Sequence, residues 1–202
     1  MKLTIGIPAY NQAQYLPEAI ESALNQTVTC EIIVVIDGSP DNSKEIAEKY
    51  PVKVIEQVNK GLASARNTAI MNMAGDFFLP LDSDDILFPH CAERLLQVAE
   101  ETGKDIIALS IQCFRLGNQT TILMKDPRLA DFDVGNRIAY CSAIKKEALL
   151  ECGGYSPRME EGWEDLHLWY DLMLRGKKIV TIPEPLVFYR TKEDSMWKNA
   201  EK

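Results

Sequence analysis

Three aspartates stand within four residues in the run Leu81-Asp82-Ser83-Asp84-Asp85. The run directly follows Phe77–Pro80, an apolar segment that is typical of a buried strand. Carboxylates this close together repel one another and are costly to remove from water, so a hard divalent cation would stabilise them. Short carboxylate side chains are the ligands that Mg²⁺ or Mn²⁺ prefers. An ordinary acidic turn is the alternative interpretation, because Asp and Ser are common turn residues.

Polar residues also follow the other segments that we expect to be parallel strands. Tyr10 and Asn11 follow the first of them, and Asp37 follows the second. Because ligands bind at the carboxyl ends of the strands in open α/β sheets, these residues are expected beside the acidic run. For Asp37 alone, capping of the next helix is an equally open interpretation.

Asp165 is a further candidate for acid–base chemistry. Leu168, Trp169 and Leu172 follow it at helical spacing, which predicts that Asp165 shares their apolar face. The same spacing places Glu164 on a solvated polar face. A carboxylate in the first turn of a helix, on its buried face, is either a cap or a functional base.

Arg66 lies on a predicted helix next to Ala63, Ser64 and Ala65, which are small enough to allow close approach. Taken alone, an arginine on such a helix is usually exposed to solvent. The remaining chemistry is restricted, because the chain has only two histidines and contains neither a GxxxxGK[ST] nor a GxGxxG motif. Carboxylates must therefore carry whatever reaction the chain performs.

The composition is that of a folded soluble protein of one domain. The 202 residues are 46% hydrophobic and 26% charged, and the net charge of −8 comes without a Lys/Arg cluster, which argues against a nucleic-acid partner. Five scattered cysteines without a CxxC pair indicate reduced thiols. No apolar run is long enough for a membrane span. We expect a cytoplasmic protein, with peripheral contact at the inner membrane face left open.

The elements that must position these residues alternate between strand and helix in the first half, which predicts a parallel α/β sheet. The predicted strands are Leu3–Ile7 (stopped by Pro8), Glu31–Ile36, Val52–Glu56, Asp76–Leu81 and Asp105–Ser110. Helices are predicted over residues 16–24 and 62–73 and after Pro89. The second half predicts a hairpin over Gln112–Met124 turning at Gly117-Asn118, a mobile polar loop over Lys125–Gly135, a strand near Ile138–Ile144, helices over Lys146–Cys152 and 163–176, and strands over Lys178–Ile182 and Leu186–Arg190.

Taken together, the motifs of this chain resemble the family 2 glycosyltransferases with a GT-A fold, over roughly residues 2 to 195 and in the family's order. The matching segments are IPAYN at 7–11, EIIVVIDGSPDNS at 31–43, NKGLASARN at 59–67, GDFFLPLDSDD at 75–85, CGGY at 152–155 and Glu164-Asp165.

The resemblance implies an α/β GT-A fold, with a Rossmann-like, mostly parallel sheet sandwiched by helices and a smaller mixed acceptor-side sheet. A single domain of residues 1–202 would bind the nucleotide sugar with about 1–110 and the acceptor with about 111–202. The implied activity is inverting transfer, dependent on Mn²⁺ or Mg²⁺, from a nucleotide-diphosphate sugar, with UDP expected as the nucleotide. The acceptor would be a hydroxyl of a glycan, lipid-linked glycan or protein in cell-surface polysaccharide or glycoconjugate synthesis.

The resemblance also assigns roles to single residues. Asp165 matches the general base, and Asp84 matches the metal ligand together with Asp82, assisted or replaced by Asp85. The nucleotide-sugar site would contain Pro8, Tyr10, Asn11, Asp37, Arg66, Asp82, Ser83 and Asp84. Glu164, Arg190 and Lys192 would serve the acceptor side or the diphosphate.

Two residues depart from the family pattern. Ile36 replaces the first acid of the DDGS block, and Lys192 stands where a histidine is frequent. The chain also stops soon after Lys192, without the C-terminal extension that many members carry, so we expect the acceptor site or membrane attachment to involve a partner subunit. The two departures and the short C-terminus leave open a catalytically inactive sugar-nucleotide-binding protein with a regulatory or scaffolding role. Asp82, Asp84 and Asp165 favour the enzyme, because a protein that only binds would not need a base.

Overall fold

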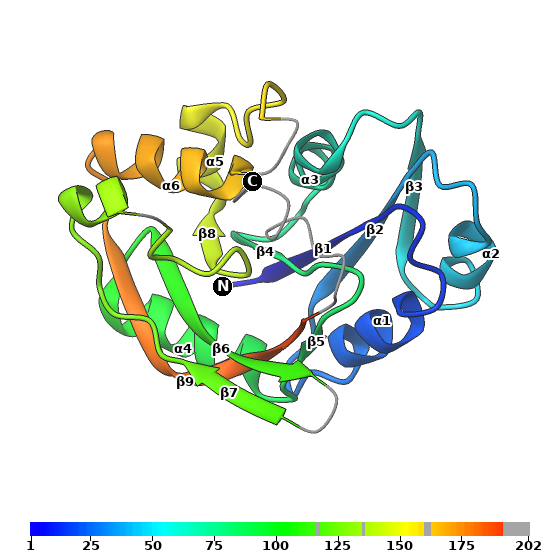
Figure 1. Ribbon diagram of the computed structural model, residues 1–202, viewed down its shortest axis with the longest axis horizontal. Coiled ribbons are helices and arrows are strands. Elements are labelled where there is room, and N and C mark those ends of the chain that lie inside the picture. Colours follow the sequence, from blue (N-terminus) through cyan, green and yellow to red (C-terminus); the bar gives the residue numbers. More distant parts are fainter. Residues whose placement is uncertain (116–117, 135, 160–162, 192–202) are drawn as a thin grey trace.

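The computed structural model describes residues 1–115, 118–134, 136–159 and 163–191. Its centre is one nine-stranded sheet in the order β3-β2-β1-β4-β8-β6-β9-β5, with β7 paired to β6 (Figure 1). The strands are β1 Leu3–Ala9, β2 Glu31–Asp37, β3 Lys53–Gln57, β4 Phe77–Pro80, β5 Ile86–Leu87, β6 Ile106–Arg115, β7 Asn118–Ile122, β8 Ala143–Lys145 and β9 Ile179–Arg190.

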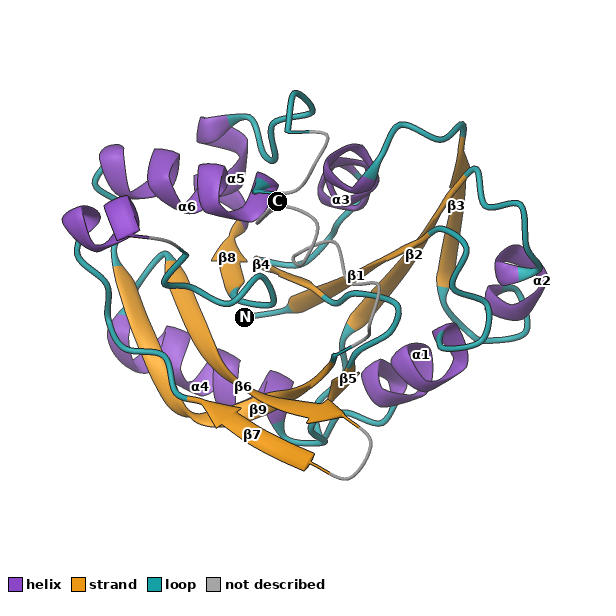
Figure 2. Ribbon diagram, in the orientation of Figure 1, coloured by secondary structure: helices purple, strands orange, loops and turns teal. Residues whose placement is uncertain are grey.

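Helices cover both faces of this sheet (Figure 2). They are α1 Leu16–Leu24, α2 Ser43–Ala47, α3 Leu62–Met71, α4 Cys91–Thr102, α5 Lys146–Cys152 and α6 Glu164–Leu174, together with the 3₁₀ helix η1 Leu129–Val134. The buried side chains of α1, α2 and α4 belong to one apolar cluster, and those of α3, α5 and α6 belong to a second. The sheet therefore separates two cores, as the alternating strand and helix patterns predict.

The first four main strands are parallel, which brings their carboxyl ends to one edge. Strand β1 pairs with β2 and β4, and Ile5 lies between Ile32 and Leu79. Strand β3 pairs with the outer side of β2. Both faces of β1, β2 and β4 are buried, so each of these three strands consists largely of apolar residues rather than of alternating ones. The polar residues that follow β1, β2 and β4 consequently leave the sheet at the same edge.

The sequence predicts that the first strand is stopped by Pro8. In the structure, β1 instead continues through Pro8 to Ala9. The carbonyl of Gly6 accepts from Leu81 on the β4 side, and Pro8 faces the same side two residues later. Pairing with β4 ends at Gly6, so the missing N–H of Pro8 removes no hydrogen bond from the sheet.

The second half continues the same sheet with antiparallel strands. Strand β8 pairs with β4 on one side and with β6 on the other, and β9 runs parallel to β6. The two predicted strands near the end of the chain form the single strand β9, whose register shifts opposite Leu109–Ser110. This irregularity lets one strand continue past Pro183 and Pro185.

Other expectations for the second half are partly corrected. The predicted hairpin is present as β6 and β7, while Gly117 at its turn lies outside the described residues. The segment predicted as a mobile loop contains η1, which buries Phe132. The strand predicted near Ile138–Ile144 is limited to β8, and β5 is too short to give a periodic signal.

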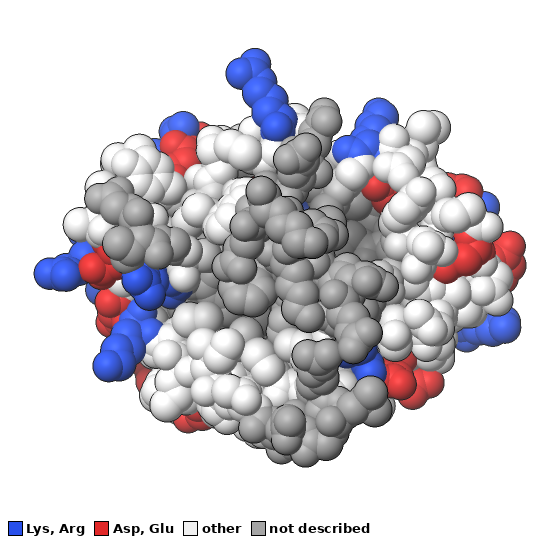
Figure 3. All heavy atoms as spheres, in the orientation of Figure 1, with Lys and Arg blue, Asp and Glu red and all other residues white. Residues whose placement is uncertain are grey.

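None of the helices in the described part of the chain is long and apolar enough to cross a membrane. On the face shown in Figure 3, Lys and Arg side chains are scattered around the periphery, often near Asp or Glu. The described residues on this face therefore form no basic patch.

Candidate functional site

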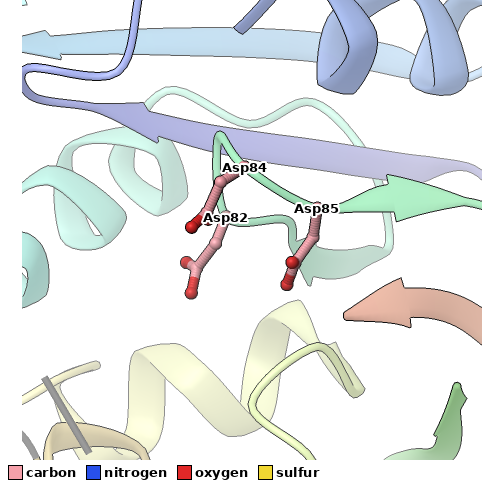
Figure 4. Close-up of side chains that lie close together, drawn as sticks. All are labelled: Asp82, Asp84 and Asp85. Atoms are coloured by element: carbon pink, nitrogen blue, oxygen red, sulfur yellow. The ribbon is translucent and has the colours of Figure 1, made fainter. Parts of the chain in front are cut away.

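The acidic run forms the turn between β4 and β5. Leu81 and Ser83 are buried in it, and the N–H of Asp85 donates to the carbonyl of Asp82 over 3.0 Å. Carboxylate oxygens of Asp82, Asp84 and Asp85 all lie within 4.8 Å of one another, and we call these three residues the acid cluster. Figure 4 shows their side chains leaving the turn toward the same side. The turn therefore collects three carboxylates where a sheet strand ends.

The members of the acid cluster differ in how the protein engages them. Asp85 is 1% exposed, and its two oxygens accept from the backbone N–H of Arg190 (2.7 Å) and from the hydroxyl of Tyr140. The Asp82 side chain is 27% exposed, and its Oδ1 accepts from Arg66 over 2.7 Å. Asp85 is thus held from within the protein, whereas Asp82 reaches the surface.

Negative charge in the acid cluster is incompletely balanced. Burial raises the pKa of Asp85 well above its usual range, and the charges of Asp82 and Asp84 raise it further. Burial also raises the pKa of Asp82 to about 6, against the opposing effect of Arg66. Carboxylates that gain protons this readily have an unmet demand for positive charge, so the acid cluster fits a divalent cation.

Arg66 is buried between the acid cluster and α6. Only 1% of its side chain is exposed, and its two terminal nitrogens donate to Asp82 (2.7 Å) and Glu164 (2.6 Å). The guanidinium carbon lies 5.4 Å from the ring centre of Tyr140 and 5.2 Å from that of Tyr155. The expectation that an arginine on this helix is exposed is therefore wrong here.

Glu164 corrects the helical-face prediction. It is 6% exposed instead of solvated, because a side chain in the first turn points back beyond the helix and here reaches the buried guanidinium of Arg66. Leu168, Trp169 and Leu172 are buried, as predicted.

Asp165 is partly buried at the start of α6. Its Oδ2 accepts from the side-chain amide of Asn136 over 2.7 Å, and its Oδ1 accepts from the N–H of Leu166 over 2.7 Å. Burial and Glu164 raise its pKa, while Arg66 and the two hydrogen bonds oppose the rise. The carboxylate thus satisfies one N–H of the first helical turn and also has the increased basicity that a general base needs.

Asp37 is enclosed by donors from the segment before α3. Its Oδ1 accepts from Gln57 (2.7 Å) and the N–H of Lys60 (2.9 Å), and its Oδ2 accepts from the N–H of Gly61 (2.9 Å). It is 3% exposed. Asp37 therefore supports the entry to α3, and not the next helix α2 as the capping interpretation expects.

Asp41 ties together the loops that follow β1 and β2. It accepts from Ala13 N (2.8 Å), from the hydroxyl of Ser39 (2.6 Å) and from both donors of Ser43. Although burial raises its pKa, these hydrogen bonds lower the value to about 2. The N–H of Asn11 donates to Ser39 Oγ, which helps to fix the loop after β1.

The predicted nucleotide-contacting residues of β1 and the loop after it differ in exposure. Tyr10 is 49% exposed, Asn11 is exposed with a φ of 53°, and Pro8 is buried in the strand. Tyr10 therefore presents a ring at the edge where the parallel strands end.

Arg190 supports the acidic turn from the other side. Its guanidinium donates to the carbonyl of Asp84 (2.8 Å) and to Glu18 (2.5 Å), and it lies 4.7 Å from the ring centres of Tyr15 and Phe114. Its contacts in the structure are thus with the protein. Lys192 lies outside the described residues.

Sequence reasoning missed three residues that organise the site: Asn67, Asn136 and Tyr140. Asn67 exchanges two hydrogen bonds with the backbone of Tyr155, at 2.7 and 2.8 Å. A Cβ on Gly154, which has a φ of +77°, would lie 2.4 Å from the Asn67 side chain, so only glycine fits there. The motif pair NKGLASARN and CGGY holds the signal for Asn67. The local sequence carries none for the other two.

Comparison with protein families and curated proteins gives consistent matches. The model of "Glycosyl transferase family 2" matches residues 4–157. The chain is 41% identical over 111 residues to the uncharacterized glycosyltransferase EpsJ of Bacillus subtilis, covering 52% of this chain and 32% of that protein. It is 40% identical over 123 residues to a chondroitin synthase of Escherichia coli (58% of this chain, 17% of that protein). It is 32% identical over 213 residues to the uncharacterized glycosyltransferase alr2836 of Nostoc (94% and 65%). The chain therefore spans less than two thirds of the length of each of these relatives.

Solved structures share the architecture. Residues 1–349 of S. aureus TarS in complex with UDP-GlcNAc align with a TM-score of 0.83 at 21% identity, over 98% of this chain and 61% of that one. A mannosyltransferase from Pyrobaculum calidifontis, in complex with GDP-Man and Mn²⁺, aligns with a TM-score of 0.73 at 18% identity (96% and 58%). The predicted GT-A fold is confirmed by these likenesses.

Proposed function

Because the chain belongs to glycosyl transferase family 2, we propose that it moves a sugar from a UDP-linked donor to an acceptor hydroxyl with inversion of configuration. The observation that carries the proposal is the acid cluster at the carboxyl end of β4, where oxygens of three aspartates lie within 4.8 Å. This edge of a parallel sheet is where open α/β folds bind their ligands. The TarS complex with UDP-GlcNAc supports a UDP donor.

Asp82 and Asp84 are the residues that would hold a divalent cation. Asp82 is partly exposed, whereas Asp85 already accepts from Tyr140 and Arg190 and would support the turn from behind. When bound, Mn²⁺ or Mg²⁺ supplies Lewis-acid stabilisation to the departing diphosphate. The Mn²⁺ in the Pyrobaculum mannosyltransferase supports this assignment.

Asp165 is the proposed general base. The acceptor oxygen attacks the anomeric carbon while its proton passes to the Asp165 carboxylate, and the bond to the diphosphate breaks with its electron pair leaving on the diphosphate. One displacement inverts the anomeric carbon and needs no enzyme nucleophile. The raised pKa of Asp165 suits this role, since general-base help is worth roughly 10²–10⁴-fold in rate.

Arg66 and Arg190 are proposed to hold carboxylates rather than the diphosphate. Both terminal nitrogens of Arg66 are used by Asp82 and Glu164 at 1% exposure, and Arg190 contacts Glu18 and the backbone of Asp84. The Arg66 side chain is 1% exposed and that of Arg190 is 19% exposed, and both guanidinium groups already donate to acceptors of the protein. Asp37 and Tyr10 would contact the nucleotide base, with Asp37 fixed in place by Gln57 and the N-terminal segment of α3.

The inactive sugar-nucleotide-binding alternative loses one of its arguments. Ile36 directly precedes Asp37 at the end of β2, but its side chain is 1% exposed and packs in the apolar core, so the residue that departs from the DDGS pattern does not present its side chain to a ligand. We further propose a glycan, free or lipid-linked, as the acceptor, which the similarity to a chondroitin synthase supports.

The deciding experiment combines binding with transfer. A panel of UDP- and GDP-sugars is titrated into the protein by calorimetry with Mn²⁺ and with EDTA, and the donors that bind are then tested for transfer to glycan acceptors. Asp165→Asn is expected to bind the donor normally and to lower transfer by roughly 10²–10⁴-fold, because the amide cannot take the proton. Asp171→Asn, on the same helix but paired with Arg175, is the matched control. Equal transfer by Asp165→Asn and wild type would place the base elsewhere.

A further inference from the structure

Asn136 and Tyr140, which no motif predicts, lie on one short segment and contact two different parts of the proposed site. We call residues 136–140 the bridging segment. It lies between η1 and β8 in the chain, and its two ends contact the acidic turn and the start of α6. One short segment therefore connects the acidic turn to the start of α6.

At one end, Tyr140 contacts the acidic turn through its hydroxyl. The hydroxyl donates to Oδ2 of Asp85 and accepts from the N–H of Asp82 over 3.2 Å. The ring of the same residue lies 5.4 Å from the guanidinium carbon of Arg66, which in turn binds Asp82. One side chain thus fixes the backbone and a carboxylate of the turn that carries the acid cluster.

At the other end, Asn136 contacts the proposed base. Its side-chain amide donates to Oδ2 of Asp165 over 2.7 Å, and its Oδ1 accepts from the N–H of Ile138 over 3.1 Å. The second bond fixes the orientation of the amide. The N–H of Leu166 fixes the other oxygen of Asp165, so the carboxylate is held at both of its oxygens.

The middle of the bridging segment is anchored in the protein. Ile138 and Ala139 are 2% and 5% exposed, and the carbonyl of Ala139 accepts from the hydroxyl of Ser142 over 2.8 Å. Directly afterwards, β8 pairs with β4, the strand that ends in the acidic turn. The segment therefore has little freedom to change the spacing between its two polar ends.

We propose that the bridging segment positions the acid cluster and Asp165 relative to each other, with Tyr140 holding the acidic turn and Asn136 orienting the base. Both are positioning residues, and the inference rests on the proposed function for the roles of the carboxylates. A fixed spacing matters because a transferase must bring the acceptor hydroxyl in line with the bond to the leaving group.

The first arm of the test deletes the Tyr140 hydroxyl. Tyr140→Phe keeps the ring over Arg66 but removes the donor to Asp85 and the acceptor of the Asp82 N–H. Calorimetry with Mn²⁺ and UDP should show Mn²⁺ affinity lowered by about 10–100-fold, as is typical when groups that support metal ligands are removed. Tyr50→Phe, which loses a hydroxyl bond to Glu21 on the surface, is the matched control and should bind Mn²⁺ as wild type does.

The second arm removes the amide that orients the base. The titratable and charged groups that face Asp165 are Glu164 on its own helix, Arg66 on α3 and Tyr155 in the loop after α5. All three remain in Asn136→Ala. Loss of a donor to the charged form raises a carboxyl pKa, so the Asp165 titration, followed by ¹³C NMR, should move to higher pH. The acidic limb of transfer should move up with it, and kcat should fall about tenfold or more at unchanged donor KM. Asn72→Ala, at the end of α3, is the control.

The outcomes separate this inference from the proposed function. A wild-type protein that binds neither Mn²⁺ nor any nucleotide sugar contradicts the proposed function, while the NMR titration still tests Asn136. If wild type binds Mn²⁺ and Tyr140→Phe binds it equally well, the bridging segment does not position the turn. An unchanged Asp165 titration in Asn136→Ala contradicts the proposal that Asn136 orients the base. Circular dichroism and melting curves confirm that each variant is folded.

Discussion

Asp37 ends β2 and the acid cluster follows β4, the two strands that flank β1, yet the protein treats their carboxylates in opposite ways. Asp37 is 3% exposed and accepts from three donors supplied by Gln57, Lys60 and Gly61. Asp82 keeps 27% of its side chain exposed, and the pKa of Asp82 is raised by burial and by Asp84. The carboxylate of a strand-end aspartate can thus have its hydrogen-bonding capacity filled by donors of the protein, as at Asp37, or keep part of it available to a ligand, as at Asp82. The number of donors within the protein distinguishes the two cases.

The largest expected effect tests whether the acid cluster binds a metal ion. Asp84→Ala should lower Mn²⁺ affinity in the presence of UDP by ~10²-fold or more, since loss of a ligand costs at least as much as loss of its support. The melting temperature without metal should stay close to that of wild type, because the change also relieves repulsion within the acid cluster.

Asp131→Ala, which removes a partly exposed acid paired with Arg128, is the control for this calorimetric measurement. If Asp84→Ala destabilised the metal-free protein strongly and left Mn²⁺ affinity intact, the acid cluster would be structural, and the contrast with Asp37 would disappear.

The next largest effect tests whether the hydrogen bonds of Asp37 stabilise the fold. Asp37→Ala removes the acceptor of the Lys60 N–H, while the Gly61 N–H and the Gln57 amide keep only longer hydrogen bonds to Asn59 and Ser64. The free energy of unfolding should therefore fall by about 2 kcal/mol. Urea denaturation of the ligand-free protein measures it.

Asp76→Ala provides the matched comparison, because Asp76 is exposed and accepts from Lys2 N. Its effect should stay within about 0.5 kcal/mol. An Asp37 variant that is as stable as wild type would contradict this structural role, and a loss of UDP affinity in that variant would then leave only the proposed contact with the nucleotide base.

The smallest effect concerns Asp41, which lies in the loop after β2 and, like Asp37, accepts hydrogen bonds from several donors within the protein. Its hydrogen bonds lower its folded pKa to about 2, below the value of an unfolded aspartate, so they stabilise the fold above that unfolded pKa. Asp41→Asn should cost about 1–2 kcal/mol at pH 7, allowing for the partial exposure of the side chain.

This difference between wild type and Asp41→Asn should shrink as the pH falls from about 4 to 2, because wild type then becomes protonated as well. Urea denaturation at several pH values tests the sign. A difference that is constant, or that grows toward low pH, would mean that Asp41 does not act through its charge.

The sequence predicts the fold well where the signals are local. The helices α1 and α5 and the strands β2 and β4 come close to their predicted bounds, because apolar periodicity and turn residues are contained in each segment. The union of two predicted strands into β9 was missed, since the local pattern around Pro183 and Pro185 reads as an interruption. Pairing with β6, whose residues lie 73 to 76 positions earlier in the chain than their partners in β9, overrides that pattern.

In the candidate site, too, the sequence predicts local features but not contacts between distant segments. The acidic run, Asp37 and Asp165 are recognisable from residue type and spacing, but the donors that engage them are not. Glu164 reads as a solvated helical residue because the prediction has no knowledge of Arg66, which lies 98 residues earlier in the chain and meets it in the core. Tyr140 and Asn136 are invisible for the same reason, since their partners come from distant segments.

The continuity of the sheet restricts how this protein can move. Strand β8 is bonded to β4 through Phe77 and Phe78 and to β6 through Ile106 and Ile107, so the sheet passes without interruption from the first half of the chain to the second. A hinge rotation between these halves would have to break backbone hydrogen bonds in the middle of the sheet. Adjustment to a bound ligand must therefore come from the loops along the sheet's carboxyl edge, over a framework that stays rigid.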